Sequence, residues 1–165
     1  MTTIQWRRLR RDEKGSAQLV ECAMERIRAF AVHFGEGGDM DTLAASVWTH
    51  YATQSPVLGL FLGVDEAAPD QVIAHSLAFL QLWNGEPVAW VVQFQSDCPM
   101  DRASLVAFHV LLDEWIHEYN ARNTIKVRRA MLSTPHKEAV YVRWTGWRRY
   151  RTLLDRQIPR GADHG

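Results

Sequence analysis

The dipeptide Asn84-Gly85 constrains the fold more than any other short feature, because it joins two segments that are rich in strand-forming residues. A two-residue type I′ turn needs a positive φ at both central residues, and Asn-Gly adopts this conformation readily. Residues 72–83 and 87–95 are therefore predicted to form an antiparallel hairpin. The short apolar run at 58–64 has the pattern of a buried strand that precedes the hairpin.

Apolar residues that recur at steps of three and four predict helices before and after this hairpin. The first helix covers residues 16–34 and is followed by the glycine-rich segment 35–38. A second helix is predicted to start at residue 39 or 41 and to end near residue 53, before a Ser-Pro step. A third is predicted at about 102–122, with one apolar side.

The two ends of the chain contribute further elements. Residues 4–11 and 124–131 have strand character, the latter because apolar and basic residues alternate. A fourth helix is predicted at about 134–145 and a final strand at 147–158, and residues 159–165 are expected to be a flexible tail. The predicted order is strand, helix, helix, three strands, helix, strand, helix and strand. Residues 1–158 are therefore expected to form one α+β domain.

Composition places the chain among compact, soluble proteins. The apolar fraction of 47% over 165 residues is ample for one buried core. No apolar stretch approaches the roughly 20 residues that cross a bilayer, and the amino terminus lacks the apolar run of a signal peptide. Cys22 and Cys98 lie far apart and in no metal-binding spacing, so a reducing cytoplasm is the expected location.

The formal net charge is zero, but the charges are segregated along the sequence. Residues 35–121 carry twelve acids and one base, whereas residues 122–160 carry eleven bases and two acids, and residues 1–34 are also basic. One interpretation is that the segments fold together and their charges mix over the surface. The other is a basic face for an anionic ligand, such as a nucleotide-containing cofactor, with nucleic acid less favoured.

The order of elements resembles that of the GNAT acyltransferases. The resemblance is most specific near the carboxyl end, where the helix Ser104–Tyr119 leads into the strand Ile125–Met131 and then into the segment Lys137–Trp147. That segment ends in Gly146-Trp147, a pair that is common at this position in the family. The resemblance implies a mixed, mainly antiparallel sheet flanked by helices. The chain is also similar to small, divergent proteins of this fold found in tailed bacteriophages.

The resemblance further implies a site for acetyl-CoA and an amine acceptor, which could be a small molecule or a protein. The cofactor would contact a strand end and the first turn of the third helix, at Val92, Gln93, Phe94, Gln95, Arg102, Ala103 and Ser104. Tyr141 would be the general acid that protonates the departing thiolate. No metal site and no membrane contact are expected.

A second hypothesis stays open, namely a GNAT-like interaction or assembly protein that has lost catalysis. The segment between Gln95 and Ser104 contains no glycine and carries Asp97 and Asp101, where an anion would dock. The family's usual tyrosine position also falls on Val142 and not on Tyr141. Such a protein would self-associate or dock on a partner, for example in a phage particle.

Two other groups of residues could carry chemistry. His109, Asp113 and His117 share one face of the third helix at four-residue steps, which could approach a metal, but the solvated face of an amphipathic helix is the better interpretation. His75 lies in the middle of a predicted strand. A partly buried, hydrogen-bonded histidine is favoured there over a catalytic base.

Overall fold

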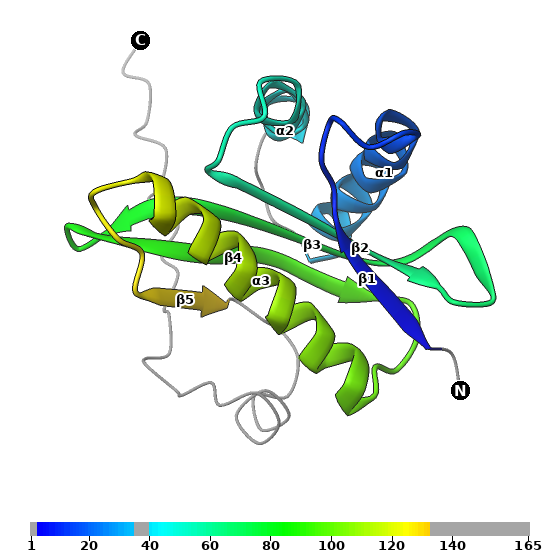
Figure 1. Cartoon of the computed structure of the whole chain (residues 1–165). Helices are drawn as coiled ribbons and strands as arrows, with labels where there is room; N and C mark the ends of the chain where they lie inside the picture. Colours follow the sequence, from blue (N-terminus) through cyan, green and yellow to red (C-terminus); the bar gives the residue numbers. More distant parts are fainter. Residues whose placement is uncertain (1–2, 35–39, 133–165) are drawn as a thin grey trace, which may run out of the picture.

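A computed structural model of the chain describes residues 3–34 and 40–132. Eight elements follow one another along these residues (Figure 1), namely β1 (Ile4–Arg8), α1 (Ser16–Phe34), α2 (Met40–Ala52), β2 (Leu58–Asp65), β3 (Ala68–Trp83), β4 (Glu86–Ser96), α3 (Arg102–Arg122) and β5 (Arg129–Leu132). The order of these eight elements agrees with the first eight elements of the predicted order. The predicted helix 134–145, the strand 147–158 and the tail 159–165 lie outside the described residues.

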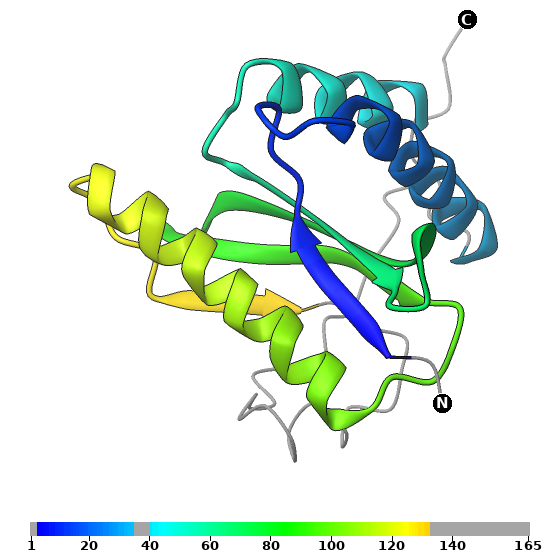
Figure 2. The same cartoon turned by 45° about the vertical axis from the view of Figure 1, so that its right-hand side comes forward.

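The five strands form one sheet in the order β1-β2-β3-β4-β5. Neighbouring strands are antiparallel except for β4 and β5, which are parallel. Helices α1 and α2 cover one face of the sheet and α3 covers the other (Figures 1 and 2). The molecule therefore has three layers, with an α+β class and a mixed, mainly antiparallel sheet, as the resemblance implied.

Each face of the sheet has its own hydrophobic core. Side chains from α1, α2 and the central strands form one core, which includes Val20, Ile27, Val47 and Leu77. The second core lies under α3 and is rich in aromatic residues, with Phe61, Phe94, Phe108 and Trp115 each almost fully buried. Strand β2 contributes to both cores, which explains why its sequence is apolar without alternation.

The hairpin between β3 and β4 forms where the sequence predicts it. Asn84 and Gly85 have φ values of 49° and 81°, and Trp83 pairs with Glu86. A positive φ at both positions is the requirement of the type I′ turn. Strand β3 begins at Ala68, four residues before the predicted start, because Ala68 pairs with Asp65 across an irregular register.

The predicted strand 124–131 is wrong in its first half, since β5 begins only at Arg129. The side chain of Asn120 explains the difference. Its Oδ1 accepts a hydrogen bond from the Val127 N–H at 2.7 Å, and its Nδ2 donates one to the Val127 carbonyl at 2.8 Å. Both backbone groups of the buried Val127 are thus satisfied without a neighbouring strand. Similarly, β1 ends at Arg8 and not at residue 11.

The ion pairs join the basic and acidic segments of the sequence. Arg8 and Arg10 contact Glu118, Arg26 contacts Asp97, and Arg129 lies near Glu86. In each pair the base comes from a basic end and the acid from the acidic middle. Among the described residues, charges of the basic and acidic segments therefore pair with one another, as the first of the two interpretations expects. None of the helices in the described ranges has the length and apolar character that crossing a membrane requires.

Candidate functional site

Strand β4 carries a β-bulge in its middle. Leu77 of β3 pairs with Gln93, but the next residue, Ala78, pairs with Val91, so Val92 is an extra residue without a partner on β3. A bulge frees backbone groups from the ladder and bends the strand. Val92 also lies one residue beyond Val91, which forms the last described pair with β5. In the described part of the chain, β4 from Gln93 to Ser96 is paired on its β3 side alone.

Gln93 lies next to the bulge and binds a buried histidine. Its Oε1 is 3.2 Å from Nε2 of His75, and its Nε2 is 3.5 Å from the Ile27 carbonyl oxygen of α1. Both side chains are almost completely buried. Burial lowers the pKa of His75 to about 4, so its imidazole is neutral near pH 7. His75 is thus the hydrogen-bonded buried histidine that the sequence favours.

The other two predicted residues on β4 differ in their surroundings. The ring of Phe94 is buried between Trp6 and Phe108, with ring centroids 5.6 and 4.6 Å away. Only the backbone of Phe94 can therefore contact a ligand. Gln95 is half-buried and pairs with His75 in the β3–β4 register.

The first turn of α3 holds the remaining predicted cofactor residues. Asp101 is the N-cap, and its Oδ1 accepts a hydrogen bond from the Ser104 N–H at 2.7 Å. The Ser104 side chain is buried, and its Oγ accepts a bond from the Ile4 N–H of β1 at 3.4 Å. Arg102 and Ala103 are exposed. Two of the three predicted residues in this turn can thus meet a ligand from solvent.

One of the two acids that sequence analysis places in the cofactor loop is paired with a base. Asp97 accepts two hydrogen bonds of 2.7 Å from the guanidinium of Arg26 in α1. These bonds hold the pKa of Asp97 below its usual value. Sequence reasoning misses Arg26 because it lies 71 residues before Asp97 in the chain. The local pattern of its helix shows an apolar stripe and gives no sign of this partner. Its charge neutralises that of Asp97 at the edge of the site.

The predicted acid Tyr141 lies outside the described residues. Along residues 3–34 and 40–132, no group of three or more His, Cys, Asp and Glu side chains could hold a metal ion. The Nδ1 atom of His109 is 2.7 Å from the carbonyl oxygen of Leu105 within its own helix. The four-residue repeat of His109, Asp113 and His117 therefore does not converge on one point.

Comparison with known proteins gives matches among solved structures alone. No family model and no curated protein matches the sequence. An integron cassette protein from the mobile metagenome of Cole Harbour Salt Marsh superposes with a TM-score of 0.62 at 13% identity, over 93% of this chain and 90% of its own. Glucosamine-6-phosphate N-acetyltransferase from Arabidopsis thaliana gives 0.58 at 11%, over 94% and 99%. A predicted acetyltransferase from Clostridium acetobutylicum, solved with acetyl-CoA, gives 0.55 at 16%, over 94% and 96%. At identities this low, the superpositions establish the fold of the chain and nothing about its activity.

Proposed function

We propose, on the premise that this chain has the fold of the GNAT acetyltransferases, that it transfers an acyl group from acetyl-CoA to an amine. The observation that carries the proposal is the bulge at Val92 on β4, one residue past the last described pair with the parallel strand β5. In the described part of the chain, the backbone of β4 beyond Val91 has no pair with β5, and this is the edge where a thioester could lie. Acetyl-CoA would also suit the reducing cytoplasm predicted from the free cysteines.

In this proposal, the backbone of β4 stabilises the negative charge that develops during acyl transfer. The amine nitrogen attacks the thioester carbonyl carbon, negative charge builds on the carbonyl oxygen, and an N–H group freed by the bulge stabilises it. The C–S bond then breaks and CoA leaves as a thiolate. Tyr141 would protonate this thiolate, and water would take the proton that the amine loses. Alignment of the amine with the carbonyl supplies the rest of the rate enhancement.

The start of α3 would hold the pyrophosphate of the cofactor. The N–H groups of Arg102 and Ala103 have no partner among the described residues, and a helix amino terminus favours an anion. The exposed guanidinium of Arg102 adds a positive charge. The pairing of Arg26 with Asp97 removes the repulsion that an unpaired carboxylate would exert there.

The acceptor class proposed is a primary amine on a small molecule. The structural neighbour from Arabidopsis is an N-acetyltransferase of an amino sugar phosphate, which motivates amino sugars as the first acceptors to test. Protein amines form the second acceptor class.

The test is the release of CoA thiol from acetyl-CoA in the presence of a panel of amines, with the acetylated product identified by mass spectrometry. The expected result is amine-dependent thiol release that falls roughly 100-fold or more in Tyr141→Phe, while the KM for acetyl-CoA stays the same. Thiol release that never exceeds the enzyme-free rate with any amine would contradict the proposal.

One observation favours a second candidate, a non-catalytic interaction or assembly protein on the same fold. The Asp101 carboxylate already accepts the Ser104 N–H, so it occupies one donor of the α3 terminus and places negative charge there. Under this candidate, wild-type protein would show self-association or a stable partner complex, as in a phage particle, and no acetyl-CoA binding. A monomer that binds acetyl-CoA would exclude it.

A further inference from the structure

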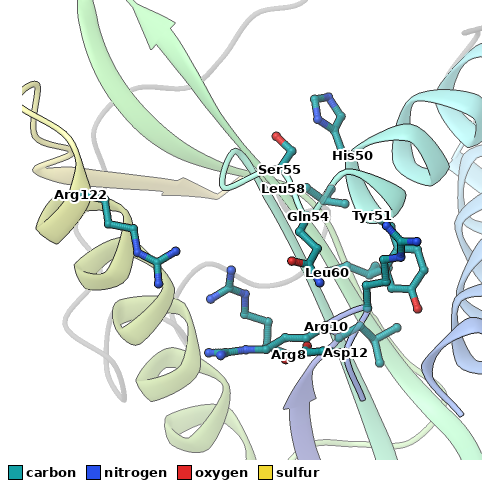
Figure 3. Close-up of a pocket in the computed structure, with 12 residues that line it drawn as sticks. Arg8, Arg10, Asp12, His50, Tyr51, Gln54, Ser55, Leu58, Leu60 and Arg122 are labelled. Atoms are coloured by element: carbon teal, nitrogen blue, oxygen red, sulfur yellow. The ribbon is translucent and has the colours of Figure 1, made fainter. Parts of the chain in front are cut away.

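A cavity of about 240 Å³ lies beside β1, at the opposite end of α3 from the proposed cofactor site. Arginine dominates its lining, with Arg8 at the end of β1, Arg10 and Arg11 in the loop that follows, and Arg122 in the last turn of α3. Figure 3 shows the side chain of Arg122 extending from α3 toward Arg8 and Arg10. We call this cavity the arginine pocket.

The acids near the arginine pocket do not balance its positive charge. Glu118 of α3 is 2.8 Å from Arg8 and 2.5 Å from Arg10, measured between carboxylate oxygen and guanidinium nitrogen. Among the described residues, Asp12 is the one acid of the lining. Four arginines therefore face two carboxylates, which leaves an excess of two positive charges around a small space.

Arg8 is the arginine of the pocket that is withdrawn from water, whereas Arg10, Arg11 and Arg122 are exposed. The side chain of Arg8 is 17% exposed. Burial lowers the pKa of Arg8 despite the hydrogen bond to Glu118, and the neighbouring charges of Arg10 and Arg122 lower it further. The guanidinium of Arg122 has no hydrogen-bond or ion-pair partner among residues 3–34 and 40–132. An anion between these guanidinium groups would relieve their mutual repulsion.

The rim of the arginine pocket carries a residue that the backbone alone does not favour. Helix α2 ends with hydrogen bonds from the Gln54 N–H to the Tyr51 carbonyl and from the Ser55 N–H to the His50 carbonyl. This is a Schellman motif, whose left-handed position usually holds glycine. Here that position holds Gln54, with a φ of 51°. Its side chain lines the pocket, with the amide on the side of β1 (Figure 3).

We propose that the arginine pocket binds a compact anion that carries a phosphate group. Guanidinium groups match the geometry of phosphate oxygens with paired hydrogen bonds, and the Gln54 amide can donate another. The pocket is smaller than the roughly 300–1,000 Å³ of typical drug-sized sites, which favours inorganic phosphate or the phosphate end of a small metabolite over a large ligand.

The phosphate site is independent of the proposed acyl transfer. Helix α3 has 21 residues and is therefore about 30 Å long, and it separates the arginine pocket from the first turn that would hold the cofactor. Loss of phosphate binding would leave acetyl-CoA binding intact, and the reverse would also hold.

The experiment is calorimetric titration of the full chain with inorganic phosphate and, separately, with glycerol 3-phosphate, at 150 mM NaCl. Wild-type protein is expected to bind at least one of them saturably, and tighter binding of the ester would identify a metabolite site. Arg122→Gln should weaken binding at least tenfold. Arg28→Gln removes the same charge from the exposed face of α1, near Asp41, and should change affinity less than twofold.

A second variant covers the case in which Arg122→Gln does not fold. Gln54→Gly keeps every charge and suits the left-handed backbone, so it should fold and bind phosphate at least threefold more weakly. No saturable binding of either ligand by the wild-type protein, or equal weakening in Arg28→Gln, would overturn the proposal. A short single-stranded DNA that binds at this salt concentration far more tightly than both ligands would also overturn it, since the surface would then recognise nucleic acid.

Discussion

The carboxylate of Asp97 accepts two hydrogen bonds from the guanidinium of Arg26, each 2.7 Å long and one on each oxygen. This pair connects α1 to the loop that follows β4. The pair reduces the electrostatic repulsion between this loop and an anion, because a paired carboxylate repels an incoming phosphate much less than a free one.

The variant Arg26→Gln tests this effect. It leaves the negative charge of Asp97 unpaired near the proposed pyrophosphate position, so the affinity for acetyl-CoA should fall roughly tenfold, or about 1.4 kcal/mol. The double variant Arg26→Gln with Asp97→Asn removes both charges and should recover most of that loss. Calorimetric titration of acetyl-CoA into the two variants measures both affinities. An affinity of Arg26→Gln equal to that of the wild type would show that Asp97 does not face the cofactor.

The buried His75 should make stability depend on pH. Its pKa is about 4 in the folded protein and about 6.5 when unfolded, so the unfolded chain binds the proton more readily. The stability that the neutral, buried His75 gives the fold is fully present above pH 6.5. It is lost as the pH falls toward 4, which lowers the free energy of unfolding by up to about 3 kcal/mol. Burial also lowers the pKa of His109, which acts in the same direction.

Urea denaturation at pH 7.5, 6.0 and 5.0 measures this dependence. The variant His75→Gln should be less sensitive to pH over this range than the wild type, and His109→Gln serves as the comparison for the second histidine. An unchanged loss of stability between pH 7.5 and 5.0 in His75→Gln would contradict the assignment.

Local signals in the sequence were sufficient for most of the fold. The Asn84-Gly85 turn and the apolar periodicity of α1 and α3 depend on neighbouring residues, so the sequence could predict them. The predicted strand 124–131 starts too early because a single side chain, Asn120, satisfies the backbone of Val127 in place of a strand. Alternation of side chains cannot reveal such a tertiary hydrogen bond.

The candidate site was harder to predict than the fold. Val92 and Gln93 lie within the predicted strand 87–95, but no local pattern shows that Val92 is a bulge or that Gln93 binds His75, since both depend on the β3–β4 register. The pairing of Arg26 with Asp97 joins residues 71 positions apart. The arginine pocket likewise assembles from β1, α2 and α3, which meet only in the folded protein.

Asn120 is expected to be an anchor for the segment that leads into β5. The variant Asn120→Ala leaves the N–H and carbonyl of the buried Val127 without partners, which should cost roughly 1–3 kcal/mol for each group that water cannot reach. Asn123→Ala removes one hydrogen bond, to the Tyr119 carbonyl, and should cost about 1 kcal/mol. Equal unfolding free energies for the two variants in urea would contradict this role.

Gln54 is expected to reduce the stability of the fold. Its left-handed backbone costs roughly 1–2 kcal/mol relative to glycine, less the entropy that glycine adds to the unfolded chain. Gln54→Gly should therefore raise the free energy of unfolding by about 0.5–1 kcal/mol. Gln54→Ala keeps the strained backbone and should bring no gain, and a loss of stability in Gln54→Gly would show that the glutamine side chain stabilises the unliganded fold.

The most direct test of the account is calorimetric titration of acetyl-CoA into the wild-type chain, Ala103→Glu and Val110→Glu. Ala103→Glu places a carboxylate in the first turn of α3, where it favours the helix but repels a pyrophosphate. Val110→Glu places the same charge on an exposed site about 10 Å further along α3. Saturable binding by the wild type and Val110→Glu, with at least a tenfold loss in Ala103→Glu, is the predicted result. Absence of binding to the wild type, or equal affinity in Ala103→Glu, would contradict the proposed acetyl-CoA site.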